Sequence, residues 1–203
     1  MPMFVVQTHF KMQKTDISQQ RIQIVIDLLL FVCITLLFHR LWWAFADVIK
    51  SIPAISGSAE FLAHQVYISS AWIDKHILLM NITTEDTTNT IRFHYVNGFI
   101  SVNESCSGLK QMYQLAVLFL IFPGPWKHKL WFIPATFVVM FLVNILRILL
   151  LSGVLLYIPS IWDFFHLWVM RPFYYVVIFL LWVVWVEKIR DPDLIREREP
   201  VEF

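Results

Sequence analysis

Four long apolar segments constrain the fold of this chain more than any other feature. They lie at residues 22–45, 106–122, 130–157 and 166–186. A helix needs roughly 20 apolar residues to cross a hydrocarbon core of about 30 Å. Hydrophobic residues make up 58% of the chain, whereas soluble domains contain roughly 45–50%. The sequence therefore predicts an all-α polytopic membrane protein with about four transmembrane helices and a membrane-embedded domain over residues 22–186.

Basic residues beside these segments predict the orientation. Three groups lie before the first span, between the second and third, and after the last: Lys11, Lys14 and Arg21; Lys127 and Lys129; Lys188, Arg190, Arg196 and Arg198. With four crossings all three groups lie on one side, which the positive-inside rule makes cytoplasmic. Residues 1–21 are then a cytoplasmic N-terminal segment, residues 187–203 a cytoplasmic charged tail, and residues 46–105 an outer loop.

The first span reads as a retained anchor rather than a cleaved signal peptide. Asp27 and Cys33 lie inside it, and no small-residue cleavage pattern follows it. We therefore expect it to be part of the membrane domain.

Two elements are predicted in the outer loop before the second span. Residues 59–80 carry Glu60 and Asp74 among their charges, so we expect an amphipathic helix at the membrane surface and not a fifth span. Residues 91–102 alternate around Asn97-Gly98, which predicts a β-hairpin with a type I′ turn. The hairpin leads directly to Cys106, and we expect it to roof the site described next.

Cys106 is the first candidate for chemistry. It lies in Asn103-Glu104-Ser105-Cys106-Ser107-Gly108-Leu109, where a polar stretch meets an apolar segment. At a helix start, free N–H groups and the helix dipole favour the thiolate. The alternative is an inert, buried thiol, which is how we interpret Cys33 in the middle of the first span.

Arg147 and His166 are predicted to reach the same depth as Cys106. If the third span enters near Leu130, Arg147 lies about 25 Å further along it, close to the outer surface. Cys106 and His166 each open a span at that surface. Three helices therefore bring a cysteine, an arginine and a histidine to one level.

Each of these partners also has a simpler interpretation. Arg147 could be a cation that reaches for the headgroups, although Asn144 lies one turn away and intramembrane charges are costly and usually functional. His166 could be an interfacial residue, and Asp163 could be its helix cap or the carboxylate that orients its ring. Other histidines remain rivals on the outer side: His39, His64, His76 and His94. The predicted topology excludes His128, which lies on the cytoplasmic side.

Other classes of ligand have no support in the sequence. A formal net charge of +1 does not predict a nucleic-acid partner. The outer face lacks a recognisable cluster of metal ligands, so we expect no metal and no cofactor.

The ordered motifs resemble the exosortase/archaeosortase family. The resemblance rests on the run 103–109, on Asn144-Ile145-Leu146-Arg147-Ile148, and on His166 at the start of the last span. It covers roughly residues 60–186 and is closest to compact, bacterial-type members. It implies a polytopic helical bundle in the bacterial cytoplasmic (inner) membrane, with its active site on the extracytoplasmic side.

The resemblance also implies an activity. It implies a cysteine transpeptidase, which processes exported proteins that end in a recognition motif, a membrane helix and a basic tail. Cys106 would form a thioacyl intermediate, Arg147 would stabilise the oxyanion with Asn144 in support, and His166 would carry the proton. The acyl group would pass to a membrane lipid or another cell-envelope acceptor.

Two further residues would assist, and other functions stay open. Lys110 would favour the thiolate, and Gly108 would leave the helix start uncluttered for an approaching backbone.

The same sequence would also suit a simple intramembrane cysteine protease, in which water resolves the thioester. It would equally suit a non-catalytic assembly or transporter subunit, in which Cys106 is dispensable.

Overall fold

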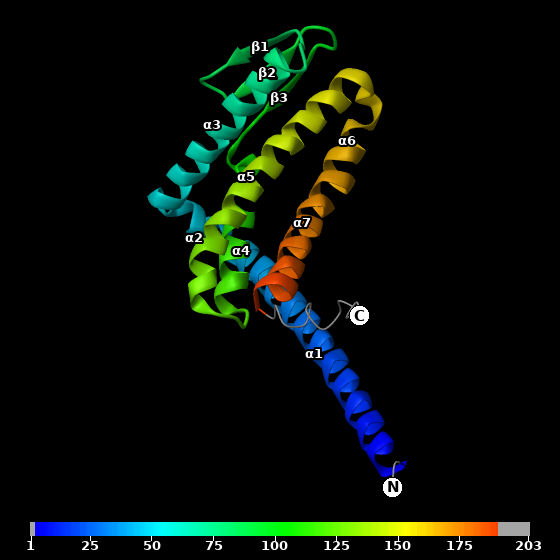
Figure 1. Cartoon of the computed structure of the whole chain (residues 1–203). Coiled ribbons are helices and arrows are strands. Elements are labelled where there is room, and N and C mark those ends of the chain that lie inside the picture. The colour runs from blue at the N-terminus through cyan, green and yellow to red at the C-terminus, as the bar shows by residue number, and fades with distance from the viewer. Residues whose placement is uncertain (1–2, 191–203) are drawn as a thin grey trace.

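The structure is a computed structural model that describes residues 3–190 of the chain, with side chains from Arg21 onward. Its first half contains a long helix α1 (Met3–Ala44), a short α2 (Ala46–Ser51) and α3 (Pro53–His76). After a small sheet come α4 (Leu109–Ile121) and α5 (Trp126–Tyr157). A last helical run folds back along α5, as Figure 1 shows. We call the end with the turn between α4 and α5 the inner end, and the end with the sheet the outer end.

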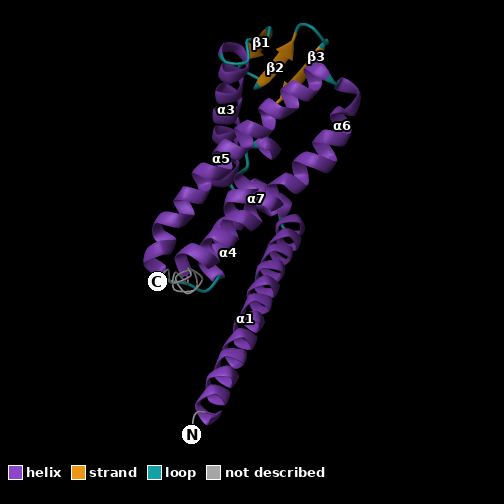
Figure 2. Ribbon diagram, turned by 45° about the vertical axis from the view of Figure 1, so that its right-hand side comes forward, coloured by secondary structure: helices purple, strands orange, loops and turns teal. Residues whose placement is uncertain are grey.

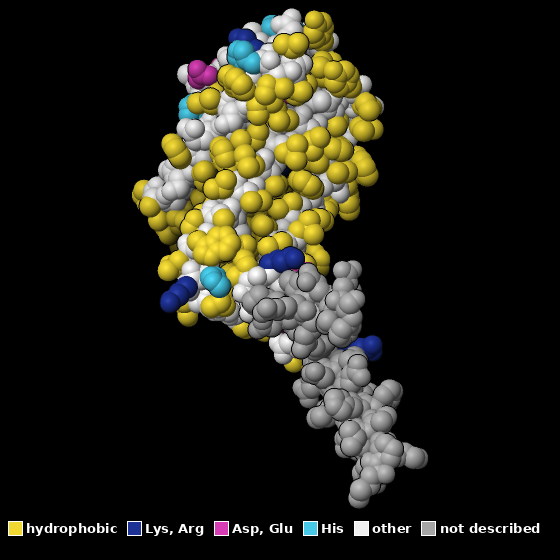
Figure 3. Space-filling view, in the orientation of Figure 1, with side chains coloured by type: hydrophobic (Ala, Val, Ile, Leu, Met, Phe, Trp, Pro, Cys, Tyr) yellow, Lys and Arg dark blue, Asp and Glu magenta, His cyan; other side chains and the backbone are white. Residues whose placement is uncertain are grey.

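Among the described residues, three helical segments are long and apolar enough to cross a membrane: Arg21–Ala44, Trp126–Tyr157 and Pro159–Arg190. Hydrophobic side chains cover most of the flank of the molecule, while charged ones gather towards its two ends (Figure 3). The chain is therefore a mostly helical, multi-pass membrane protein. The predicted second span is shorter than expected, because α4 has 13 residues and is only about 20 Å long.

The start of α4 corrects the sequence prediction for Cys106. The thiol lies in a 3₁₀ turn, Glu104–Cys106, and not in the first turn of the membrane helix. Gly108 separates the two elements with a φ of 78°, a left-handed conformation that glycine adopts without steric cost. The α-helix therefore begins at Leu109, after Cys106.

The last helical run also begins earlier than predicted. A 3₁₀ turn (Pro159–Ile161) leads into α6 (Trp162–Phe164), a π-helical turn (Phe165–Val169) and α7 (Met170–Val184). His166 therefore lies inside a π turn and does not open the helix. Turns of this kind are rare and occur often at functional sites.

The last two spans are longer than predicted. α5 starts at Trp126, four residues before the predicted start, and ends at Tyr157 as predicted. A second π-helical turn (Trp185–Arg190) continues the final helix into the predicted charged tail. The rest of that tail, residues 191–203, lies outside the described residues.

The outer loop contains a three-stranded antiparallel sheet: β1 (Ile82–Glu85), β2 (Thr90–Phe93) and β3 (Gly98–Ser101). Figure 2 shows all of these strands at one end of the bundle. β2 and β3 form the hairpin, but the pair Phe93↔Gly98 leaves a four-residue connection and not the predicted two-residue turn. The helix predicted at residues 59–80 is α3, which begins six residues earlier and is not among the candidate spans.

Two apolar clusters hold the molecule together. The inner one is rich in aromatic side chains and joins α4, α5 and α7 around residues such as Phe119, Phe132 and Trp182. The outer one joins the sheet to α3 and α5 around Val66, Ile91 and Ile148. Because α5 is about 48 Å long, its outer third can pack against the α3–sheet unit while the rest crosses the membrane.

Candidate active site

A cavity of about 710 Å³ lies between the C-terminal end of α1, the first turns of α3 and the first turns of α7. Cys106, Arg147 and His166 all line it. The three residues that were predicted to lie at one depth therefore surround the same cavity. They come from the 3₁₀ turn, α5 and the π turn. Cys106 is only partly buried, so its thiol is open to a ligand in this cavity.

Asn144 fixes the Cys106 turn to α5. Its amide donates a hydrogen bond to the backbone carbonyl of Cys106. Gly108 makes this approach possible, because a Cβ there would lie 3.1 Å from the Asn144 amide nitrogen. We predicted that Gly108 leaves space for a substrate backbone, but Asn144 fills that space and positions the cysteine turn.

Arg147 is a buried cation without an acidic partner in the described part of the chain. Its exposed fraction is 8%, and the two salt bridges found among the described residues do not include it. Nη1 donates to the Tyr174 hydroxyl at 3.2 Å and Nη2 contacts His166 Nε2 at 3.0 Å. Nε is buried and has no hydrogen-bond partner. A buried guanidinium that is not neutralised is available to a negatively charged or carbonyl ligand.

The contact with Arg147 defines the tautomer of His166. A guanidinium only donates hydrogen bonds, so Nε2 of His166 must accept, and the ring is neutral with its proton on Nδ1. The ring also packs against Trp162, with ring centroids 4.9 Å apart. His166 is therefore held in one orientation with its basic nitrogen facing Arg147.

Tyr174 completes the network. This residue was not predicted from the sequence. Its hydroxyl donates to the Asn144 side-chain oxygen and accepts from Arg147, while its ring lies 5.4 Å from the guanidinium carbon. The available signal was a buried tyrosine in an apolar helix, eight residues after His166. Without the fold, nothing separates Tyr174 from Tyr175.

The predicted supporting residues have mixed outcomes. Lys110 lines the cavity, but its amine contacts His39 at 3.3 Å and lies 4.9 Å from the centroid of the Trp43 ring. Asp163 does not line the cavity, and α6 has no side-chain cap. In the described structure the group that orients the His166 ring is Arg147 and not Asp163.

The rival histidines divide into two groups. His39 lines the cavity, where Nδ1 also contacts the Tyr175 hydroxyl at 3.0 Å. The others do not line it; His64, for example, contacts Asn89 at 2.8 Å. The residues that line the cavity include none from the strands, so the prediction that the hairpin roofs the site is wrong. Among the described residues no three His, Cys, Asp or Glu side chains are grouped as a metal site requires.

Comparison with known families identifies the family of this chain. The family model described as transmembrane exosortase matches residues 22–186, which include every residue of the network above. The chain belongs to the transmembrane exosortase family. No significant match was found among curated proteins or among solved structures. In this exosortase the matched region begins just after Arg21 and ends inside the last π-helical turn.

Proposed function

We propose that this exosortase is a membrane cysteine transpeptidase that cleaves the C-terminal sorting signals of exported proteins. Its substrates would carry a recognition motif, a transmembrane helix and a basic tail. The acyl group would be transferred to a membrane lipid or another cell-envelope acceptor. We also propose that the cavity faces the extracytoplasmic side of the bacterial cytoplasmic membrane. A membrane-impermeant thiol reagent added to intact cells tests this orientation, because it should label Cys106.

The observation that supports this proposal best is the un-neutralised Arg147 in the cavity that contains Cys106. A carbonyl oxygen becomes negatively charged when a nucleophile attacks its carbon, and a fixed cation stabilises that charge strongly where water is excluded. The guanidinium keeps its charge even when it is buried. A helix-pairing arginine in an assembly subunit would instead be expected to face a carboxylate.

The hydrogen bonds support a specific first step. In the resting state Arg147 occupies the His166 nitrogen that would act as a base. When the substrate carbonyl draws Nη2 of Arg147 away, Nε2 of His166 becomes free to accept the Cys106 thiol proton. The sulfur then bonds to the carbonyl carbon, and Arg147 stabilises the oxyanion. The substrate itself would thus activate the nucleophile.

The remaining steps return the protein to its starting state. As the tetrahedral intermediate collapses, the C–N bond breaks, and His166 passes the proton to the leaving amine. The thioester on Cys106 then reacts with a hydroxyl or amine of the acceptor, whose proton goes to His166. The C–S bond breaks, and the proton returns to the Cys106 sulfur. Asn144 keeps the cysteine turn in register with Arg147 throughout.

Replacing Cys106 tests the proposal directly. In a co-expression assay with an exported substrate, Cys106→Ala should reduce processing roughly a thousandfold or more, as loss of a nucleophile does in other enzymes. Cys33→Ala is the matched control, because Cys33 is exposed on α1 and does not line the cavity. Mass spectrometry of the wild-type product separates transfer to an acceptor from hydrolysis. Normal processing by Cys106→Ala would refute the enzymatic proposal.

A further inference from the structure

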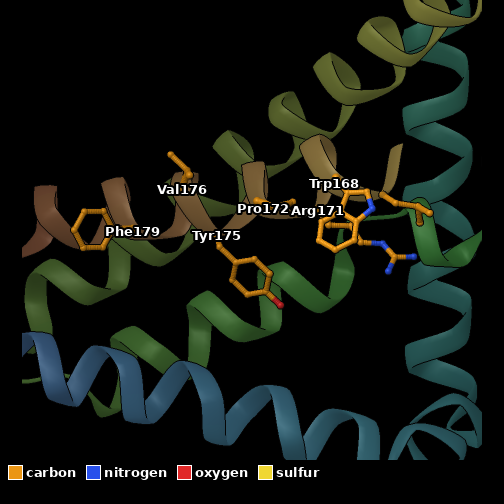
Figure 4. A pocket seen from close by; sticks show the side chains of 7 residues that line it. Trp168, Arg171, Pro172, Tyr175, Val176 and Phe179 are labelled. Atoms are coloured by element: carbon orange, nitrogen blue, oxygen red, sulfur yellow. The ribbon is translucent and has the colours of Figure 1, made fainter. Parts of the chain in front are cut away.

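An apolar groove of about 530 Å³ lies along the last helical run, over the π turn Phe165–Val169 and α7, next to the cavity that contains Cys106. Its lining runs from Leu167 to Phe179 and includes Arg171 as its one charged side chain. Arg171 and Tyr175 line both the groove and the cavity. Figure 4 shows these two side chains on the same side of α7, with Phe179 further along the helix. The groove therefore begins at the mouth of the cavity.

The length of the groove fits one leaflet of a membrane. Leu167 and Phe179 are about 18 Å apart along the helix, and half of a hydrocarbon core is about 15 Å. At the end of the groove farther from the cavity, Phe31 of α1 packs against Phe179 and Trp182, with ring centroids 5.7 and 4.8 Å apart. α1 therefore limits the groove there. A complete transmembrane helix, which needs about 30 Å, is too long for it.

The charged side chains around the cavity, where the groove begins, favour the binding of an anion. Besides Arg147, the described residues that line the cavity include three cations, Lys50, Lys110 and Arg171, and one carboxylate, Glu104. Neither salt bridge in the described part of the chain involves Arg171. A basic side chain at the interface above an apolar groove complements a phosphate that is attached to an acyl chain.

We propose that this groove binds an anionic phospholipid from the leaflet on the cavity side. One acyl chain lies along α7 as far as Phe179, and the phosphate lies at Arg171. The headgroup is then at the mouth of the cavity. Binding of this kind does not need Cys106 to be a nucleophile, so the lipid site can be tested separately from the proposed activity.

Native mass spectrometry of the delipidated full chain in detergent provides the test. Phosphatidylglycerol should bind more tightly than phosphatidylcholine with the same acyl chains. Arg171→Gln should weaken phosphatidylglycerol binding roughly fivefold, the effect of one basic side chain near a membrane surface, and remove the preference. Val176→Trp should fill the groove and weaken both lipids. Val176 is 53% exposed, so this change should leave folding intact.

Matched controls exclude general effects. Arg21→Gln removes the same charge at the start of the apolar segment Arg21–Ala44, away from the groove, and Leu142→Trp adds the same ring to α5 at a side chain that is 57% exposed. Neither should change lipid binding. Equal binding of the two lipids would overturn the proposal, as would controls that weaken binding equally. Displacement of the lipid by glycerol phosphate alone would indicate a site for a free phosphate, and displacement by an uncharged 20-residue apolar helix would indicate a peptide groove. Either result would also overturn it.

Discussion

The two ends of the bundle both bury an arginine, but they neutralise it differently. At the inner end Arg190 donates to both carboxylate oxygens of Asp27, at 2.9 and 2.7 Å. Their side chains are 9% and 2% exposed. At the outer end Arg147 is just as buried, yet its contacts are a tyrosine hydroxyl and a histidine nitrogen. The first arginine is matched by a carboxylate, while the second keeps its net charge.

This difference indicates what each charge is for. A bidentate ion pair between α1 and the end of the last helix is a closed arrangement, so it can join two helices far apart in the chain. A cation whose partners are neutral and which lines a cavity is an open arrangement, and a ligand can complete it. Burial alone does not separate the two cases; the partner and the access do.

The largest expected effect is on stability at the inner end. Asp27→Ala should lower the free energy of unfolding by about 3–5 kcal/mol, the typical cost of breaking a buried pair. The processing rate of the molecules that remain folded should not change. Thermal unfolding in detergent and processing normalised to folded protein provide the two readouts. Asp47→Ala, which removes an exposed carboxylate of α2, is the control. A folded Asp27→Ala protein without activity would break the comparison.

The next effect is on activity at the outer end. Arg147→Lys should fold normally but lose roughly a hundredfold or more in processing rate, the usual effect of removing one oxyanion donor. Lysine cannot bind His166, Tyr174 and a carbonyl with one planar group. Arg190→Lys is the matched variant and should lower the unfolding temperature while activity remains. If both variants behave alike, the outer arginine has no special role.

Depth along a helix explains why the sequence predicted the main site residues. The rise per residue is fixed, so counting from the ends of the apolar segments places Arg147 level with Cys106. The same counting cannot predict which way a side chain points. The π turn around His166 and the hydrogen bond from Asn144 to the cysteine turn both depend on contacts between helices, so the role of Arg147 in orienting His166 appeared only in the fold.

Long-range pairs and short polar strands could not be predicted from the sequence either. Asp27 was visible as a charge inside the first span, but its partner lies 163 residues away. β1 has the sequence Ile-Thr-Thr-Glu, which has no long apolar alternation, and it becomes a strand only because β2 offers an edge. The hairpin had stronger local signals, although its connection is longer than the Asn97-Gly98 pair suggested.

A smaller effect is expected when the outer network loses one hydroxyl. Tyr174→Phe removes the group that joins Arg147 to Asn144, so the guanidinium should be held less precisely. A hydrogen bond to a charged group contributes about 1.5–3 kcal/mol, and we expect kcat to fall about tenfold with KM unchanged. Tyr175→Phe is the matched control for kcat, because its hydroxyl contacts His39 and not Arg147. An unchanged kcat in Tyr174→Phe would remove Tyr174 from the network.

The last effect depends on pH and concerns Asp74, a carboxyl that is fully buried at the outer end but does not line the cavity. One oxygen accepts from Ser152 of α5 at 2.9 Å, and the other has no hydrogen-bond partner. Burial raises the pKa of Asp74 from 3.8 to about 6, while the Ser152 hydrogen bond opposes the shift. The folded state thus holds this proton more tightly than the unfolded state, and stability should fall as the pH rises from about 4 to about 6.

Asp74→Asn isolates this contribution, because all other titrating groups are shared with the parent. The difference in unfolding free energy between parent and variant should change by up to about 3 kcal/mol across that pH interval and stay constant above it. Activity per folded molecule should be the same in both proteins, since Asp74 does not reach the cavity. If the two unfolding profiles are parallel at every pH, Asp74 does not titrate between pH 4 and 6. If Asp74→Asn folds but loses activity, the outer end cannot be divided into a site and a separate structural contact.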